Sequence, residues 1–368
     1  MVGPKAIIHL GRLKANYDLV KQKVHGKQIM AVVKANGYGH GGIACAKALE
    51  NHGCRFFAVF SFDEGVELRN AGIKSDILLL SRLDARRIDE AIDHGLILNI
   101  SNKLDFTPLI TYAKKIGTCP KVHLKVDTGM TRLGIDFDDA ANLIQKLKDH
   151  PEIRCEGIYS HFATADEGDL SYARKQESRF NSILDFCAKE GVSFKYIHFS
   201  NSGAILNMDQ SRYDIVRVGM LLYGAFPSNE VPMEIPFQPV MEFKAPVVSV
   251  RRVPAGTHVS YGGVYETKLD THIGVIQCGF ADGFPRAWYK DGYVSYQGKQ
   301  FKIAGRVCMD QFMVDFGDTL PKKGDDVLMI GKDKLDTVRM ETIADQIQST
   351  PYVIATAIGG RTERIYQD

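Results

Sequence analysis

The chain lacks the features that mark several broad protein classes. Its 368 residues contain no apolar run long enough to cross a bilayer, and its N-terminus lacks the charged-then-apolar layout of a signal peptide. No run of five basic residues occurs, and the formal net charge is only +2. Because a nucleic-acid interface needs a clustered basic face, we expect neither a nucleic acid nor a membrane as partner.

Cysteine is sparse and scattered. The seven cysteines stand at positions 45, 54, 119, 155, 187, 278 and 308, and no two of them form a C-x-x-C pair. This spacing indicates neither a disulfide framework nor a zinc site. We therefore predict reduced thiols in a cytoplasmic protein, and no metal.

The dinucleotide-binding fingerprint is also missing. The stretch G-Y-G-H-G-G at 37–42 follows an apolar run, but no strand-end acidic residue stands about twenty positions further on. This argues against a doubly wound open sheet, which is the alternative to the barrel fold predicted below.

Eight short apolar runs are present in the first two-thirds of the chain. They occupy residues 29–33, 56–60, 77–80, 97–100, 122–126, 155–159, 196–199 and 215–218. Continuous runs of this kind suit strands that are buried on both faces of a parallel sheet. Between them, helical spacing marks residues 42–51, 63–71, 84–94, 138–149 and 170–190. The pattern predicts an α/β fold, a (β/α)₈ barrel.

The composition changes at 232–239, where three prolines fall within eight residues. Beyond this linker signal, short β-branched runs at 243–253, 273–278, 293–303 and 312–316 predict strands, and 338–348 predicts a helix. We therefore expect a barrel domain at 1–235 and a mostly β domain at 236–368.

Polar residues stand where five of the eight apolar runs end. These residues are Lys34, Lys125, Asp127, Arg132, His161, His198 and Arg217. Because barrel enzymes place their chemistry at the carboxyl ends of the strands, we expect these side chains to meet at one rim. Any single one of them could instead be an ordinary solvated residue.

The same rim has the layout of a phosphate site. Ser202 and the pair Gly219–Met220 follow the seventh and eighth runs, where barrels often bind phosphate. Burial would favour the neutral amine of Lys34, which can form a Schiff base with an aldehyde. A phosphate site, a neutral lysine and a facing arginine together suggest pyridoxal phosphate.

The motif A-V-V-K-A-N-G-Y-G-H-G at 31–41 resembles the cofactor-attachment signature of the alanine racemases. The resemblance runs essentially end to end. Supporting matches are H-L-K-V-D-T-G-M-T-R-L-G, S-H-F-A-T-A-D-E, H-F-S-N-S-G, V-R-V-G-M-L-L-Y-G, V-S-Y-G-G, F-A-D-G-F-P-R and G-R-V-C-M-D-Q. The resemblance implies a homodimer with shared active sites. It also implies pyridoxal-phosphate-dependent interconversion of L- and D-alanine, which supplies peptidoglycan synthesis.

The resemblance also implies residue roles. Lys34 would hold the cofactor and act as one base, and Tyr261, from the partner subunit, would act as the second. The cofactor-binding residues would be Lys34, Tyr38, His161, His198, Asn201, Ser202, Arg217, Gly219, Met220 and Tyr352. Arg132 and the backbone at Met309 would hold the substrate carboxylate, flanked by Arg306 and Asp310. Lys125 matches a lysine that is carbamylated in some members of the family.

Three places depart from the usual family pattern. Phe280 replaces a tyrosine near the substrate entrance, Tyr352 lies in T-P-Y-V, and the tail reads G-G-R-T-E-R. A serine racemase or one of broad specificity is therefore an alternative, since an apolar pocket discriminates poorly against one added hydroxyl. Three other functions compete with racemisation. Residues 240–368 argue against a non-catalytic carrier of the cofactor, and Arg217 argues against a decarboxylase of similar fold. A barrel that binds a sugar phosphate would show no lysine-dependent visible absorbance.

Overall fold

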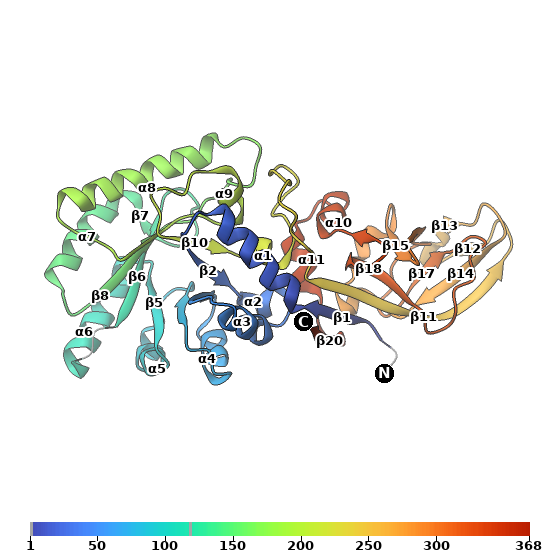
Figure 1. Cartoon of the computed structure of the whole chain (residues 1–368), viewed down its shortest axis with the longest axis horizontal. Coiled ribbons are helices and arrows are strands. Elements are labelled where there is room, and N and C mark those ends of the chain that lie inside the picture. The colour runs from blue at the N-terminus through green and yellow to red at the C-terminus, as the bar shows by residue number, and fades with distance from the viewer. Residues whose placement is uncertain (1–2, 118–119) are drawn as a thin grey trace.

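The computed structural model describes residues 3–117 and 120–368 (Figure 1). Two parts lie next to each other along the long axis of the molecule, a barrel on the left of the view and a mostly β domain on the right. The described cysteines are all free thiols, and Cys119 lies outside the described residues.

The left-hand part is a closed barrel of eight parallel strands. The strands are β2 (Gln28–Val32), β3 (Phe56–Val59), β4 (Asp76–Leu79), β5 (Leu96–Ile100), β6 (Lys121–Asp127), β8 (Arg154–Tyr159), β9 (Tyr196–His198) and β10 (Ile215–Val218). Their order is β5-β4-β3-β2-β10-β9-β8-β6, and β5 pairs with β6 to close the ring. This closure confirms the predicted barrel and excludes the open sheet.

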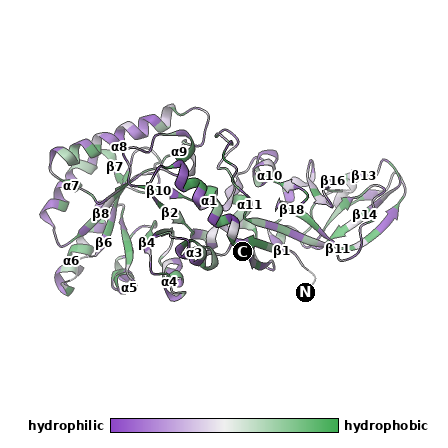
Figure 2. Ribbon diagram, in the orientation of Figure 1, coloured by the Kyte–Doolittle hydropathy of each residue, from purple (hydrophilic) through white to green (hydrophobic). Residues whose placement is uncertain are grey.

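Helices surround the strands. They are α1 (Leu10–Lys23), α3 (Gly42–Asn51), α4 (Phe62–Asn70), α5 (Ile88–Asp93), α6 (Phe106–Ile116), α7 (Ala140–Asp149), α8 (Ser171–Lys189) and α9 (Ser202–Asn207). Figure 2 shows hydrophobic residues concentrated on the central strands, whereas hydrophilic and hydrophobic residues alternate along α8. Each amphipathic helix therefore covers the barrel with one face and meets solvent with the other. No helix in the described ranges is long and apolar enough to cross a membrane.

The right-hand domain is built on a second sheet. Its strands are β1 (Lys5–His9), β11 (Met241–Val253), β14 (Thr271–Ile276), β15 (Tyr293–Tyr296), β16 (Lys299–Lys302), β17 (Phe312–Asp315), β18 (Asp326–Lys332), β19 (Thr337–Val338) and β20 (Glu363–Gln367). A separate two-stranded sheet joins β12 (His258–Val259) to β13 (Tyr265–Glu266). Two helices, α10 (Met340–Gln346) and α11 (Pro351–Ala357), complete the domain.

The first strand of the chain belongs to this second sheet. The range expected for the barrel, 1–235, includes β1, but β1 pairs antiparallel with β11 and parallel with β20. In β1 only Ala6 and Ile8 are fully buried, an alternation typical of a sheet covered on one face. The domain boundary at 235/236 itself stays a prediction.

Two other expectations need correction. The run 293–303 is not one strand but the hairpin β15–β16, because Gln297 and Gly298 both have positive φ (52° and 76°) and turn the chain. The helix expected at 84–94 begins as a 3₁₀ turn over Ala85–Arg87, capped by Asp84, and becomes α5 only afterwards. The helices α1, α6 and α11 are additional to those that the pattern predicts.

The contact between Gly39 and α11 generates a test of fold stability. Gly39 has φ 80°, and a Cβ added there would lie 2.3 Å from the carbonyl oxygen of Ala355. Gly53 has φ 106°, but a Cβ there would meet nothing within 4 Å. We expect Gly53→Ala to cost about 1–2 kcal/mol, from backbone strain alone. Gly39→Ala should cost about 1–3 kcal/mol more, because backbone must also move.

Urea unfolding of both variants and the unaltered chain checks this expectation. Equal shifts of the unfolding midpoint would show that the close approach of Gly39 to α11 carries no additional cost.

Candidate active site

Lys34 stands at the rim of the barrel, just beyond the carboxyl end of β2. It begins the short helical turn α2 (Lys34–Tyr38), and its side chain is partly buried. Burial is the main cause that lowers the pKa of Lys34, and the positive charges of Arg132 and Arg217 lower it further. Glu64 opposes this shift. The amine is thus closer to its neutral, nucleophilic form than a solvated lysine is.

The turn after Lys34 is left-handed over five residues. The φ angles are 51° at Ala35, 53° at Asn36, 62° at Gly37, 50° at Tyr38 and 80° at Gly39. This conformation costs about 1–2 kcal/mol for each residue other than glycine. Three such residues occur in a row of five, so contacts from elsewhere must hold the turn.

Some of these contacts come from distant parts of the chain. The Asn36 Oδ1 atom accepts a hydrogen bond from the Gly42 N–H at 2.8 Å, which joins the turn to α3. The Gly39 carbonyl accepts one from Arg364 Nε of β20 at 2.8 Å. The turn that carries Lys34 is therefore fixed both by its own barrel helix and by the last strand of the C-terminal domain.

Hydroxyl groups gather around Gly219, which follows β10. A Cβ placed on Gly219 would lie 2.7 Å from Tyr38 Oη, and the Gly219 N–H donates to Ser202 Oγ at 3.3 Å. The rings of Tyr38 and Tyr352 lie 5.9 Å apart. Burial raises the pKa of both tyrosines, so their hydroxyls remain protonated and can donate. Glycine at 219 therefore lets the Tyr38 hydroxyl approach the backbone that follows β10.

Two other predicted cofactor ligands lie next to this cluster. Asn201 is the N-cap of α9, and its Oδ1 accepts the Ala204 N–H at 3.0 Å. The side chain of Asn201 is thus engaged in capping, and its cofactor contact stays a prediction. Met220 is buried at the start of a 3₁₀ turn, Met220–Tyr223, directly after Gly219.

Arg217 lies in the wall of the barrel with only 4% of its surface exposed. Its guanidinium donates to three carbonyls and two imidazoles. The acceptors are Ser160 O at 2.7 Å, Phe199 O at 2.9 Å, His198 O at 3.2 Å, His198 Nδ1 at 2.9 Å and His161 Nδ1 at 3.1 Å. Among the residues that the structure describes, no carboxylate pairs with it. Burial lowers the pKa of Arg217 to about 10, so it remains charged near neutral pH.

Arg217 fixes the protonation of the histidines around it. Since a guanidinium can only donate, the Nδ1 atoms of His161 and His198 must accept. The proton of His198 is then on Nε2, which lies 2.9 Å from Nδ1 of His123. The proton of His123 is left on its own Nε2, a buried atom without a partner among the described residues. Burial, with the Arg217 charge as the next cause, holds the pKa of all three histidines below its usual value, for His123 at about 3.

His123 is absent from the site residues that the sequence predicts. A signal was present, because His123 lies two residues before Lys125 on β6 and therefore points to the same side of the strand. Both side chains are buried, with exposed fractions of 0% and 6%. The alternation of side chains along a strand therefore indicates from the sequence that His123 lies on the same side of β6 as Lys125.

Lys125 and the loop after β6 complete the cationic rim. Burial, then the charges of Arg217 and Arg132, lowers the pKa of Lys125 to about 7. The carboxylate of Asp127 accepts four backbone N–H groups, those of residues 129–132, at 2.8–3.1 Å. Asp127 therefore holds the loop that presents Arg132, whose side chain is exposed.

Of the predicted residues in the C-terminal domain, Tyr352 reaches the rim, but Tyr261 does not. Tyr261 begins the 3₁₀ turn Tyr261–Gly263 between β12 and β13, and Figure 1 places these strands at the end of the molecule away from the barrel. Tyr261 is 70% exposed and Met309 is 56% exposed. One chain thus assembles Lys34, Tyr38, Arg217 and their neighbours but does not bring Tyr261 or Met309 to them.

The backbone around Tyr261 is strained and anchored. Ser260 has φ 68° and ψ −179°, a region that is almost reserved for glycine. Its Oγ donates to the Arg306 carbonyl at 2.7 Å. Asp310 is held in turn by Arg361, whose Nη1 lies 2.9 Å from Asp310 Oδ1. Arg306 and Asp310, which flank Met309 in the sequence, are therefore both held by contacts from other segments.

The residues at the barrel rim fit pyridoxal phosphate. The Tyr38 and Ser202 hydroxyls lie against the Gly219 backbone, and Lys34 follows β2, which pairs with the strand that carries Arg217. Arginine, lysine and hydroxyl donors are the groups that hold a phosphorylated anionic ligand. In residues 3–117 and 120–368 no group of three histidine, cysteine, aspartate or glutamate side chains could hold a metal ion.

Comparison with known proteins agrees with this geometry. Residues 8–227 match the family model described as alanine racemase, N-terminal domain, and residues 240–366 match alanine racemase, C-terminal domain. The alanine racemase of Carboxydothermus hydrogenoformans is 38% identical over 366 residues, which cover 98% of each chain.

Solved structures of alanine racemases superpose on the whole chain. The alanine racemase of Streptomyces lavendulae superposes with a TM-score of 0.93 at 34% identity, covering 100% of this chain and 98% of that one. The alanine racemase of Bartonella henselae, solved with covalently bound pyridoxal phosphate, gives a TM-score of 0.90 at 29% identity, with both chains fully covered. The chain therefore belongs to the alanine racemases, a family of isomerases that use pyridoxal phosphate.

Proposed function

We propose that this protein interconverts L- and D-alanine by moving the Cα proton between two bases, Lys34 on one face of the substrate and Tyr261 of a second copy on the other. The observation that carries the proposal is the distribution of these residues. The rim around Lys34 is complete in one chain, whereas Tyr261 stands exposed at the far end of the same chain. When bound, pyridoxal phosphate supplies an electron sink that makes the Cα proton removable.

Lys34 has the properties that the first base needs. An unperturbed lysine holds its proton too tightly to act as a base near neutral pH. Burial and the charges of Arg132 and Arg217 shift Lys34 toward its neutral form. The hydroxyls of Tyr38 and Ser202 and the backbone at Gly219 would hold the cofactor phosphate.

Arg217 would face the pyridine nitrogen, as the family resemblance implies. Its N–H groups donate to acceptors fixed by the barrel backbone, and it has no lone pair to accept a proton. This distinguishes the site from a decarboxylase of similar fold, which usually has an acidic residue at that position. The β domain with V-S-Y-G-G similarly argues against a non-catalytic carrier.

Arg132 and the backbone at Met309 would bind the substrate carboxylate. The pKa of Lys125 near 7 leaves a share of its amine neutral, and only a neutral amine can be carbamylated. A carbamate on Lys125 would place a negative charge beside Arg132 and orient its guanidinium. We therefore propose that Lys125 is carbamylated.

A homodimer with two shared sites follows from the same distribution. Large apolar side chains near Tyr261 are exposed, and they are Val264 (44%), Phe280 (41%) and Met309 (56%). A second copy that covered this surface would bring its barrel rim to Tyr261. On the basis of the family resemblance we also propose that the protein prefers alanine to serine. By the same resemblance it would act in the cytoplasm and supply D-alanine to peptidoglycan synthesis.

Tyr261→Phe tests the second base. The variant should keep the visible absorbance of the bound cofactor but lose racemisation by about 10²–10⁴-fold, because the phenol that moves the proton is gone. Circular dichroism of L-alanine and of D-alanine solutions measures both directions. Tyr112→Phe, which removes a hydroxyl from the outer helix α6, is the matched control. Full activity of Tyr261→Phe in both directions would refute its role.

Mixing two inactive variants tests the shared site. In a dimer of Lys34→Ala with Tyr261→Phe, one site combines an intact Lys34 with an intact Tyr261 of the other chain. Random reassembly should therefore recover about a quarter of the native activity, since half of the dimers are mixed and each has one intact site. Unfolding and refolding the variants together, against each refolded alone, is the measurement. If no activity returns, the two residues do not act across the dimer.

Lys125→Met tests the pKa of the buried lysine. Between about pH 7 and the ordinary lysine value, the unfolded chain binds a proton that the folded chain does not. The free energy of unfolding should therefore rise with pH in this window, and Lys125→Met should flatten the rise. Urea midpoints at about pH 7 and about pH 9 in buffer free of carbon dioxide measure it. Lys115→Met, at an exposed site on α6, should keep the native slope; an equal slope in both variants would contradict the assignment.

A further inference from the structure

Glu64 joins the first turn of α4 to the turn that carries Lys34. Its Oε2 atom accepts the N–H groups of Phe60 at 2.8 Å and Ser61 at 3.0 Å. Its Oε1 atom accepts the N–H of Ala35 at 2.6 Å. The carboxylate therefore bridges two segments that are 29 residues apart along the chain, and both of its oxygens are used.

Helix capping explains only half of this arrangement. In the capping box of α4, the Ser61 Oγ accepts the Glu64 N–H, and the Glu64 side chain accepts the Ser61 N–H. That motif uses Oε2 and would be complete without Ala35. The bond from Oε1 to Ala35 serves a different segment, and Ala35 is the first left-handed residue after Lys34.

The charge of Glu64 also differs from that of its surroundings. The charged and titratable groups that interact with Lys34 come from five different parts of the barrel. They are Arg217 on β10, Arg132 after β6, Lys125 on β6, His161 after β8 and Glu64 on α4. Arg217, Arg132 and Lys125 are cations, and Glu64 is the acid of this set.

We propose that Glu64 is a positioning residue for Lys34: its carboxylate holds the strained turn through the Ala35 amide and supplies the negative charge next to that turn. The proposal rests on the proposed function only in that Lys34 is taken as the cofactor anchor. A carboxylate held by three backbone N–H groups cannot rotate away, so its distance from the turn is fixed. The Ala35 amide, the first N–H after Lys34, is thereby tied to α4.

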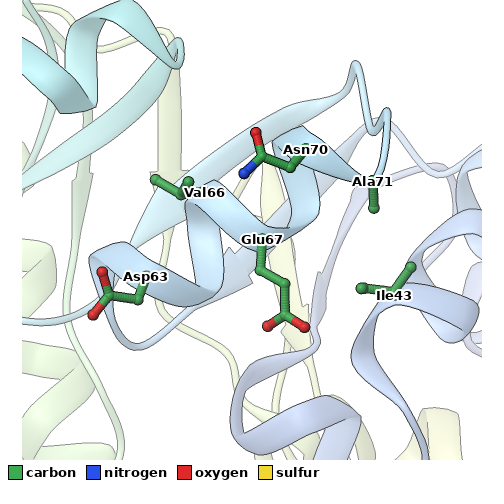
Figure 3. A pocket seen from close by; sticks show the side chains of 6 residues that line it. All are labelled: Ile43, Asp63, Val66, Glu67, Asn70 and Ala71. Atoms are coloured by element: carbon green, nitrogen blue, oxygen red, sulfur yellow. The ribbon is translucent and has the colours of Figure 1, made fainter.

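The same helix supplies a matched control. Glu67 lies one turn after Glu64 on α4, is exposed, and lines an outer groove of about 420 Å³ between α3 and α4 together with Asp63 (Figure 3). Glu67→Gln therefore removes the same charge from the same helix without a contact to the Lys34 turn.

The test follows the titration of Lys34 in two ways. In the holoenzyme, the visible absorbance of the bound cofactor is recorded against pH for the unaltered chain, Glu64→Gln and Glu67→Gln. In the cofactor-free full chain, the rate at which an amine-selective reagent modifies Lys34 is recorded against pH by mass spectrometry of the peptide that contains it.

Removal of an opposite charge favours the neutral amine, so Glu64→Gln should move both midpoints to lower pH by roughly one unit. Glu67→Gln should leave both unchanged. Unchanged midpoints in Glu64→Gln, or equal shifts in the two variants, would overturn the proposal, even if Glu64→Gln also lowers the urea midpoint.

Glu64→Asp keeps the inference testable if Glu64→Gln does not fold. It retains the negative charge but shortens the side chain by one methylene, so both midpoints should move less than half a unit while the cofactor dissociates faster. A cofactor dissociation rate equal to that of the unaltered chain would contradict the positioning role. If the unaltered chain shows no absorbance that depends on Lys34, the proposed function fails first, and the two failures are thereby distinguished.

Discussion

The structure of the site depends on one buried charge, the guanidinium of Arg217, which is neutralised by no carboxylate among the described residues. Neutral acceptors satisfy its hydrogen bonds, three of them backbone carbonyls that the barrel strands hold in place. A buried charge without a counter-ion is costly unless its hydrogen bonds are made, so the surrounding strands must keep these acceptors in position. The positive charge then acts on every titratable group nearby. Burial is the main cause that lowers the pKa of Lys125 and His161, and the Arg217 charge lowers both further. Its N–H groups also decide which nitrogen of His161 and His198 carries the proton.

The turn after Lys34 is the second constraint. A left-handed run of five residues is unfavourable by itself and forms only because several distant segments bind it. Glu64 holds its beginning and Arg364 holds its end. Arg364 lies three residues after Arg361, which contacts Asp310 on the outward-facing surface of the other domain. The segment 361–364, which leads into the last strand, therefore braces both the anchor turn and the surface that would serve a second copy.

The elongated shape of the chain accounts for the way the site is divided. The barrel contains most of the predicted cofactor-binding groups, and the C-terminal domain carries Tyr261 between β12 and β13, at the opposite end of the molecule (Figure 1). Lys34 approaches a substrate from one side only, so the opposite side requires a group that is fixed independently. Strain at Ser260 and its bond to the Arg306 carbonyl give Tyr261 such a fixed direction.

The barrel could be predicted from the amino-acid sequence, because eight continuous apolar runs have to be buried on both faces, and all eight are strands of one closed sheet. The side chains that share the rim could also be predicted, since parallel strands end at one edge and Lys34, Lys125, His161, His198 and Arg217 stand at strand ends. Local pattern could not place β1, whose partners β11 and β20 lie more than 230 residues away.

The protonation of the histidines, the exposure of Tyr261 and the contact of Glu64 with Ala35 come from the three-dimensional packing alone. Each of these depends on distances between atoms that are far apart in the chain, and a one-dimensional pattern does not contain such distances. In the sequence, Glu64 looks like an ordinary residue of a helix N-terminus, and strand alternation puts His123 on the side of Lys125 without showing its contact with His198. Their roles emerge only when packing brings a second segment within hydrogen-bond distance.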